Sequence, residues 1–229
     1  MIPLSQDRRG HAAPVAAITL MLVCVMVFLA QCWSVGLDEH LITSFGFIPQ
    51  NFFGGYSGVS GEPLLTPTVS LLSYMFLHGG WLHLIGNMLF LAVFAGKVED
   101  ATGHAGFVLF FVLCGIAAAL AQGAVEPGSV KPVIGASGGV SGVLGAYLLL
   151  HPRAEITVAI PIFIVVQIVQ LPAWIVLIAW FLFQLLYDLF PDPTSASIAF
   201  RAHLGGFLAG MVLILLFTPR LRAATTRNR

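Results

Sequence analysis

A serine and a histidine far apart in the sequence are suited to nucleophilic chemistry if the fold brings them together. Ser137 follows Gly135-Ala136 at the start of an apolar segment, and His203 lies inside another apolar segment. Backbone N–H groups at a helix N-terminus are unpaired, and together with the helix dipole they stabilise a developing negative charge. An imidazole in contact with the hydroxyl takes its proton and activates the oxygen. Ser137 and His203 are therefore the candidate catalytic residues.

The small residues around both positions have a second interpretation. Ser137 is followed at intervals of four by Ser141 and Gly145, and Gly206 is followed by Gly210. Stripes of this kind let membrane helices pack closely. A lone histidine in an apolar segment is also explained by a hydrogen bond within a helix bundle, although ionisable groups at such depth often mark functional sites. The pattern alone leaves packing and catalysis open.

Two further polar residues are spaced to donate hydrogen bonds to one acceptor. His83 and Asn87 are four residues apart and share one helix face. Their side chains could donate hydrogen bonds to a tetrahedral oxyanion, and such donors are each worth roughly 3 kcal/mol of the barrier in serine proteases of known mechanism. The alternative is that the pair joins helices. No carboxylate is placed to complete a triad, so a dyad is predicted.

Metal and nucleic-acid functions are not expected. His78 and His83 are five residues apart, which misaligns them on a helix, and no His-Glu-x-x-His pattern occurs. Haem ligation by paired intramembrane histidines stays an alternative. The three cysteines lack metal-type spacing. The formal net charge is zero, so no basic face for nucleic acid is expected.

Composition predicts a polytopic, all-α membrane protein. The chain has 229 residues, of which 58% are hydrophobic and 9% charged, and its mean hydropathy is +0.95. Crossing the ~30 Å hydrocarbon layer takes roughly 17 to 25 residues of helix. Six spans are predicted, near 13–33, 80–96, 104–124, 137–150, 173–189 and 198–218. They form one domain, 13–218, between an N-terminal segment, 1–12, and a basic tail, 219–229.

Two connections need separate predictions. The first, between the first and second spans, is rich in glycine and phenylalanine and is expected to lie at the membrane interface. The second, from Ile156 to Leu171, would reach only about 24 Å as a helix. It also contains Pro161, Gln167 and Gln170. We therefore expect a loop or shallow element there.

Basic residues predict the orientation of the spans. With both termini cytoplasmic, eight of the ten basic residues lie inside, namely Arg8, Arg9, Lys97, Arg153, Arg220, Arg222, Arg227 and Arg229. The second, fourth and sixth spans then run from outside to inside. His83, Ser137 and His203 each lie near the start of one of these spans, so all three are expected at a similar depth near the outer face.

Taken together, these motifs resemble the rhomboid family of intramembrane serine proteases. The resemblance covers roughly residues 71 to 218. It is carried by His78-Gly79-Gly80-Trp81-Leu82-His83-Leu84-Ile85-Gly86-Asn87, Val98-Glu99-Asp100-x-x-Gly103-His104, Gly135-Ala136-Ser137-Gly138 and Ala202-His203-Leu204-Gly205-Gly206.

The resemblance implies a six-helix, rhomboid-like bundle that needs no metal or organic cofactor. It implies hydrolysis of peptide bonds in or beside transmembrane segments, so the expected partners are transmembrane protein substrates and membrane lipid. Ser137 would be the nucleophile and His203 the general base; His83, Asn87 and the Ser137 N–H would form the oxyanion hole. His78 would be structural. A mobile fifth helix or loop cap would admit substrate laterally.

Two positions depart from the family pattern, and two other functions stay open. Val69-Ser70 stands where the family often has Trp-Arg, and Ser141 stands where some members have tyrosine beneath the base. One alternative is a catalytically inactive relative that binds client helices; the other is a transporter, which would show an internal repeat. Lack of an Arg/Ser-rich presequence favours a bacterial plasma membrane. The oligomeric state is not predicted.

Overall fold

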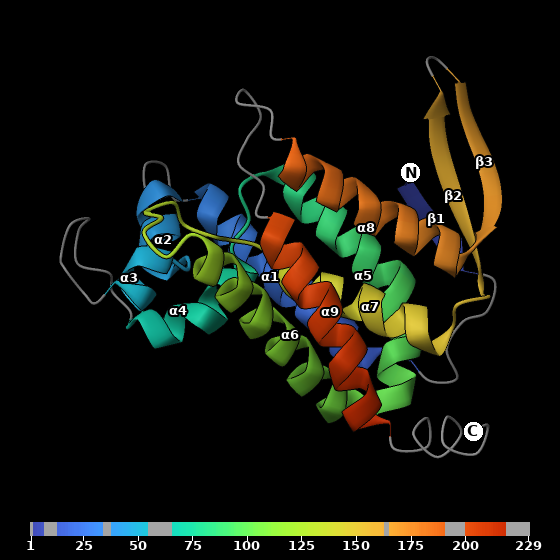
Figure 1. Cartoon of the computed structure of the whole chain (residues 1–229), viewed down its shortest axis with the longest axis horizontal. Helices are drawn as coiled ribbons and strands as arrows, with labels where there is room; N and C mark the ends of the chain where they lie inside the picture. Colours follow the sequence, from blue (N-terminus) through green and yellow to red (C-terminus); the bar gives the residue numbers. More distant parts are fainter. Residues whose placement is uncertain are drawn as a thin grey trace.

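The computed structural model describes residues 2–6, 13–33, 38–54, 66–162, 165–190 and 200–218. In chain order the elements are β1 (Ile2–Gln6), α1 (Val15–Trp33), α2 (Asp38–Phe45), α3 (Pro49–Phe53), α4 (Pro67–Ser73), the 3-10 helix η1 (Tyr74–Phe76), α5 (Trp81–Thr102), α6 (His104–Val125), α7 (Ser137–Leu150), β2 (Glu155–Ile162), β3 (Val165–Pro172), α8 (Ala173–Leu189) and α9 (Phe200–Phe217) (Figure 1). The predicted tail 219–229 lies outside the described residues.

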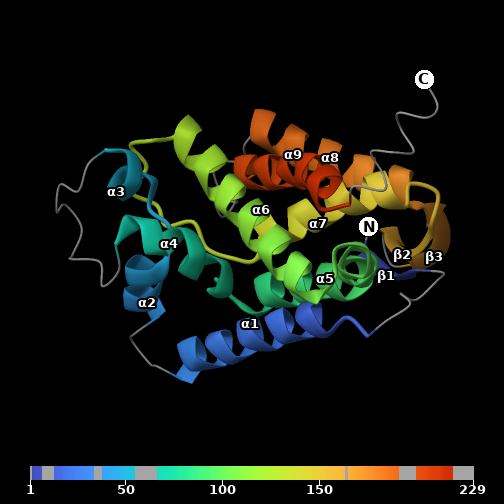
Figure 2. The same ribbon diagram turned by 90° about the horizontal axis from the view of Figure 1, so that it is seen from below.

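A helix occupies each of the six predicted spans. Within the described residues, four helices are long and apolar enough to cross a membrane, namely α1, α5, α6 and α9. The helices α7 and α8 are apolar but shorter. Six crossings therefore stay a prediction. Figure 2 shows α1 on one side of the bundle and α8 and α9 on the other, with α5, α6 and α7 between them.

The helix that begins at Ser137 lies at the centre of the bundle. It packs against α5, α6 and α9, and every residue from Gly138 to Tyr147 is buried. A Cβ atom at Gly206 would lie 2.2 Å from the Gly138 carbonyl oxygen, and one at Gly210 would lie 2.0 Å from that of Gly142. Backbone thus touches backbone, and the packing interpretation of the small residues is confirmed for α7 and α9.

The second predicted span ended too early. Lys97, Glu99 and Asp100 indicated an end at residue 96, but α5 continues to Thr102. Glu99 is only 2% exposed, and its two carboxylate oxygens accept hydrogen bonds from the backbone N–H groups of Ala16 and Ala17, both at 2.8 Å. The first turn of a helix leaves such N–H groups unpaired. The Glu99 carboxylate can therefore be buried, because the N–H groups in the first turn of α1 need hydrogen-bond acceptors.

The all-α prediction was wrong in one respect, because the chain contains a three-stranded antiparallel sheet of order β1-β2-β3. The segment predicted as a loop or shallow element forms the hairpin β2–β3, and β1 comes from the N-terminal segment. The Tyr147 hydroxyl donates to Gln6 Oε1 at 2.7 Å, which ties β1 to α7. On β2, Ile156 and Val158 are fully buried.

The connection between α1 and α5 is held by backbone pairing and short helices. Phe47 is buried and forms a bridge with Val133, with N–O distances of 3.0 and 2.8 Å. The Ser73 hydroxyl donates to the Phe45 carbonyl at 2.6 Å. These contacts position the connection although Val69 and Ser70, at the family's Trp-Arg positions, lie in α4. Residues 55–65 lie outside the described part.

Candidate active site

A tight turn places Ser137 at the N-terminus of α7. Gly135 has φ +115, a conformation that favours glycine, and its N–H donates to the Tyr74 carbonyl at 2.9 Å. A Cβ at Gly138 would lie 2.5 Å from Ala118 Cβ and 2.9 Å from the Tyr74 hydroxyl. Glycines on both sides of the serine are thus required by the turn and by packing.

His83 borders the space in front of the serine. Its Nδ1 accepts a hydrogen bond from the Gly79 N–H at 3.4 Å, so the proton of the neutral ring is on Nε2. The position that a Cβ of Gly135 would occupy lies 2.6 Å from His83 Nε2 and 3.6 Å from Ser137 Oγ. A donor and the candidate nucleophile therefore face one small space, which is open because residue 135 has no side chain.

Asn87 lies one turn beyond His83 on α5. It is 6% exposed, and its Nδ2 is buried without a hydrogen-bond partner among the described residues. Leaving such a donor unpaired costs roughly 1–3 kcal/mol. A buried, unsatisfied donor next to His83 on the same helix face is what an oxyanion site requires in the absence of substrate.

The imidazole of His203 is oriented by helix α8. Its Nδ1 lies 3.0 Å from Gln184 Oε1. An amide oxygen only accepts, so Nδ1 carries the proton and Nε2 has the free lone pair. The rings of Trp180 and Phe200 lie 6.1 and 6.3 Å from the imidazole, centre to centre. The tautomer is the one that a general base needs.

The two proposed dyad members do not share a hydrogen bond among the described residues. The Ser141 hydroxyl donates to the Ser137 carbonyl at 2.7 Å, so Ser141 serves its own helix. His203 lies one turn before Gly206, whose backbone meets that of Gly138, the residue after Ser137. Close packing of α7 and α9 therefore brings the two residues to the same end of this helix pair.

Gln184 is the residue that the sequence analysis missed. From the sequence, only carboxylates were considered as a third group, and none was placed to complete a triad. Gln184 is 9% exposed in a helix that is otherwise almost entirely apolar. A buried polar residue in such a helix is a signal for function, and it was available in the sequence.

His78 holds the loop that leads into α5. Its backbone N–H and carbonyl are both bound by the Gln31 side chain of α1, at 3.1 and 3.2 Å. Its Nδ1 lies 3.2 Å from the Phe76 carbonyl oxygen, and its Nε2 is buried without a partner in the described structure. Burial lowers the pKa of this imidazole to about 4, and the nearby His83 adds to the effect.

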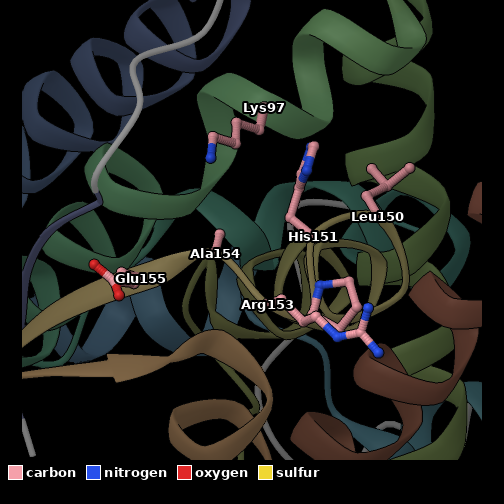
Figure 3. Close-up of a pocket in the computed structure, with 7 residues that line it drawn as sticks. Lys97, Leu150, His151, Arg153, Ala154 and Glu155 are labelled. Atoms are coloured by element: carbon pink, nitrogen blue, oxygen red, sulfur yellow. The ribbon is translucent and has the colours of Figure 1, made fainter.

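A cavity in the described part of the chain lies away from these residues. It has a volume of about 590 Å³ and is lined by Lys97, Leu150, His151, Pro152, Arg153, Ala154 and Glu155 (Figure 3). These residues are at the ends of α5 and α7 remote from His83 and Ser137. None of the candidate catalytic residues contributes to it. No group of three metal-ligating side chains occurs in the described part of the chain.

The chain is similar to proteins of one known family. A family model, the Rhomboid domain, matches residues 66–220. The chain is 32% identical over 141 residues to Rhomboid-related protein 2 of Mus musculus, covering 61% of this chain and 45% of that protein. It is 30% identical over 152 residues to RHOMBOID-like protein 5 of Arabidopsis thaliana, covering 66% and 45% respectively.

A third relative is Rhomboid-like protein 11, chloroplastic, of Arabidopsis thaliana, with 29% identity over 143 residues, 62% of this chain and 50% of that protein. The chain thus spans about half the length of the curated relatives it matches. Because the family model covers well over half of the chain, the chain belongs to the rhomboid family. With its long apolar helices it is an integral membrane protein.

Proposed function

We propose that this rhomboid is an intramembrane serine endopeptidase that cleaves peptide bonds in or near transmembrane segments of membrane proteins. One observation carries the proposal: Ser137 Oγ and His83 Nε2 border the same small space, and the unpaired Nδ2 of Asn87 lies one turn away. A nucleophile facing two neutral donors is arranged for attack on a carbonyl and for binding the oxyanion that results.

The chemical steps follow from these positions. The scissile carbonyl occupies the space beside Gly135; Ser137 Oγ attacks its carbon while His203 Nε2 takes the hydroxyl proton. The oxyanion accepts hydrogen bonds from His83 Nε2–H, Asn87 Nδ2–H and the Ser137 backbone N–H. His203 then protonates the leaving amine, and the C–N bond breaks. Water, deprotonated by His203, releases the acyl group and restores the serine.

Helix α8 would have two roles in this mechanism. Gln184 holds the His203 tautomer that leaves Nε2 free, as the carboxylate does in a triad. By family resemblance, the same helix or a loop cap moves to admit a substrate helix. We also propose a bacterial plasma membrane with both termini cytoplasmic, so that the site opens to the outside. No step requires a metal or an organic cofactor.

One observation favours an alternative. Ser137 and His203 share no hydrogen bond in the described structure, as expected for a catalytically inactive rhomboid-like protein that binds client transmembrane helices. In serine hydrolases this contact often tightens only when substrate binds. Labelling of Ser137 by a fluorophosphonate probe, and its loss in His203→Ala, distinguishes the active enzyme from the inactive relative.

The deciding experiment is cleavage in liposomes. The purified protein is incubated with a panel of single-span substrates, and products are mapped by mass. Ser137→Ala should abolish cleavage. The matched control is Ser141→Ala, which removes a hydroxyl one turn away that bonds only to its own helix and should leave cleavage intact. Turnover by Ser137→Ala would rule out the mechanism.

A further inference from the structure

The sheet presents an apolar face to its surroundings. Ile2 of β1 pairs with Ala159 of β2, and Val166 and Ile168 lie on the same side of β3. We call Ile2, Ala159, Val166 and Ile168 the outer face. Ile2, Val166 and Ile168 are 46%, 61% and 66% exposed, whereas Ile156 and Val158 on the opposite face are fully buried. The end of the sheet remote from α8 is therefore apolar on the outer face, whereas Ser5, Thr157 and Gln170 lie on the same side nearer to α8.

This hairpin lacks the charged residues that protect exposed strands in water, although Pro161 lies in β2 and Pro172 ends β3. After Glu155, no charged residue occurs before Asp188. Among the described residues, the strand order β1-β2-β3 leaves one edge of β3 without a partner strand. Soluble proteins blunt such edges with lysine, proline or bulges, because a long apolar edge promotes aggregation. The composition of this hairpin therefore indicates an environment other than bulk water.

The position of the hairpin indicates which environment. β3 ends at Pro172 and leads directly into α8, and Figure 1 shows β2 and β3 extending out beside α8, away from the other helices. On α8, Trp174, Ile178 and Leu182 are spaced by four residues and are 46%, 42% and 50% exposed. Such a row on a membrane helix faces lipid. Tryptophan in the first turn is typical of the membrane–water interface.

We propose that the outer face of the sheet docks on the lipid bilayer, at the boundary between headgroups and acyl chains. Val166 and Ile168 lie on the strand that leads directly into the lipid-facing row of α8, and Gln170, on the same side of β3 nearer to α8, has an amide that headgroups and interfacial water can bond. The sheet cannot lie within the hydrocarbon core, because the N–H and C=O groups along the edge of β3 would have no hydrogen-bond partners there. Headgroups and interfacial water satisfy them. The proposal does not depend on proteolysis.

The test measures the environment of residue 168 in membranes. In a background with Cys24, Cys32 and Cys114 replaced by alanine, Ile168→Cys is labelled with an NBD fluorophore. The protein is reconstituted in vesicles of phosphatidylethanolamine and phosphatidylglycerol. Arg153→Cys, at an exposed position just before β2, is the matched control. We expect quenching of the 168 label by lipids brominated near the headgroup, and several-fold weaker quenching by iodide than for the 153 label.

Equal iodide quenching at the two positions would overturn the proposal. A melting temperature close to that of the unlabelled parent shows that each variant is folded. A second arm dilutes the protein to one copy per vesicle. If the 168 label stays shielded from iodide at this dilution, the result supports contact with lipid. If the shielding disappears, a second copy of the protein covers the outer face and the proposal is wrong.

Discussion

At the scale of single residues, the site depends on hydrogen bonds that fix tautomers. Gly79 N–H sets the His83 ring as a donor at Nε2, and Gln184 Oε1 sets His203 as an acceptor at Nε2. In the proposed mechanism the two imidazoles thus have opposite roles, which their neutral hydrogen-bond partners decide. The motif residues could be predicted from the sequence. Gln184 could not be connected to His203 because the contact joins two helices whose relative rotation is set only by packing.

Gln184 gives the first prediction at this scale. Gln184→Leu removes the acceptor for Nδ1–H, so cleavage should fall by about tenfold to a hundredfold, the usual cost of losing a group that orients a functional histidine. The loss should appear in kcat and not in KM, measured with a single-span substrate in liposomes. Gln184→Glu keeps an acceptor oxygen and should retain more activity than the leucine variant. Equal activity of all three proteins would contradict an orienting role.

His78 gives a prediction about pH. Its pKa is about 4 in the folded protein and 6.5 without burial, so between these values the unfolded chain binds more protons. The free energy of unfolding must therefore fall as pH decreases from 6.5 to 4. Thermal unfolding in detergent should show a lower melting temperature at pH 5 than at pH 7.5. In His78→Gln this drop should be smaller; an unchanged drop would show that other groups cause it.

At the scale of elements, the sequence predicted where the helices lie along the chain but not which elements pack against one another. Hydropathy marked all six helices, but it ended α5 at residue 96 because the sequence does not reveal that Glu99 meets the start of α1. The hairpin was missed although its residues are rich in valine and isoleucine, which favour strands. β2 and β3 pair with each other, but the third strand, β1, lies at the other end of the sequence and could not be connected to them.

The contact between α7 and α9 gives a prediction at this scale. Gly210→Ala places a Cβ 2.0 Å from the Gly142 carbonyl oxygen, so the helices must separate. Overpacking of this kind costs about 1–3 kcal/mol of the free energy of unfolding. Gly86→Ala, where nothing lies within 4 Å of the new Cβ, is the matched control and should be neutral or stabilising by up to ~1 kcal/mol. Melting temperatures that do not differ would contradict backbone contact.

At the scale of the whole molecule, α1 lies outside the matched rhomboid domain but is built into the bundle. Glu99 binds the start of α1, and the Gln31 side chain near its end binds the His78 backbone. The helix α1 is thus held near both of its ends. The contact near its C-terminal end is with the loop that precedes the candidate oxyanion residues. Through this connection we expect changes in α1 to affect the site without touching it.

Glu99 gives a prediction for the attachment of α1. Glu99→Ala leaves two buried N–H groups unpaired, which should lower the free energy of unfolding by about 3 kcal/mol. Glu99→Gln keeps one acceptor and should cost less. The exposed neighbour is the control: Asp100→Ala should change stability by no more than about 1 kcal/mol. The three variants are compared by thermal unfolding in one detergent. Similar melting temperatures for Glu99→Ala and Asp100→Ala would contradict the proposed anchor.

The pairing of β1 with β2 also sets an order of assembly. β1 is translated before α1, whereas its partner strand follows the helix that carries Ser137. The leading strand must therefore wait while α1, α5, α6 and α7 are synthesised and inserted. Only then can Gln6 reach the Tyr147 hydroxyl. A segment translated before all of these helices is thus fixed in place only after they have been made.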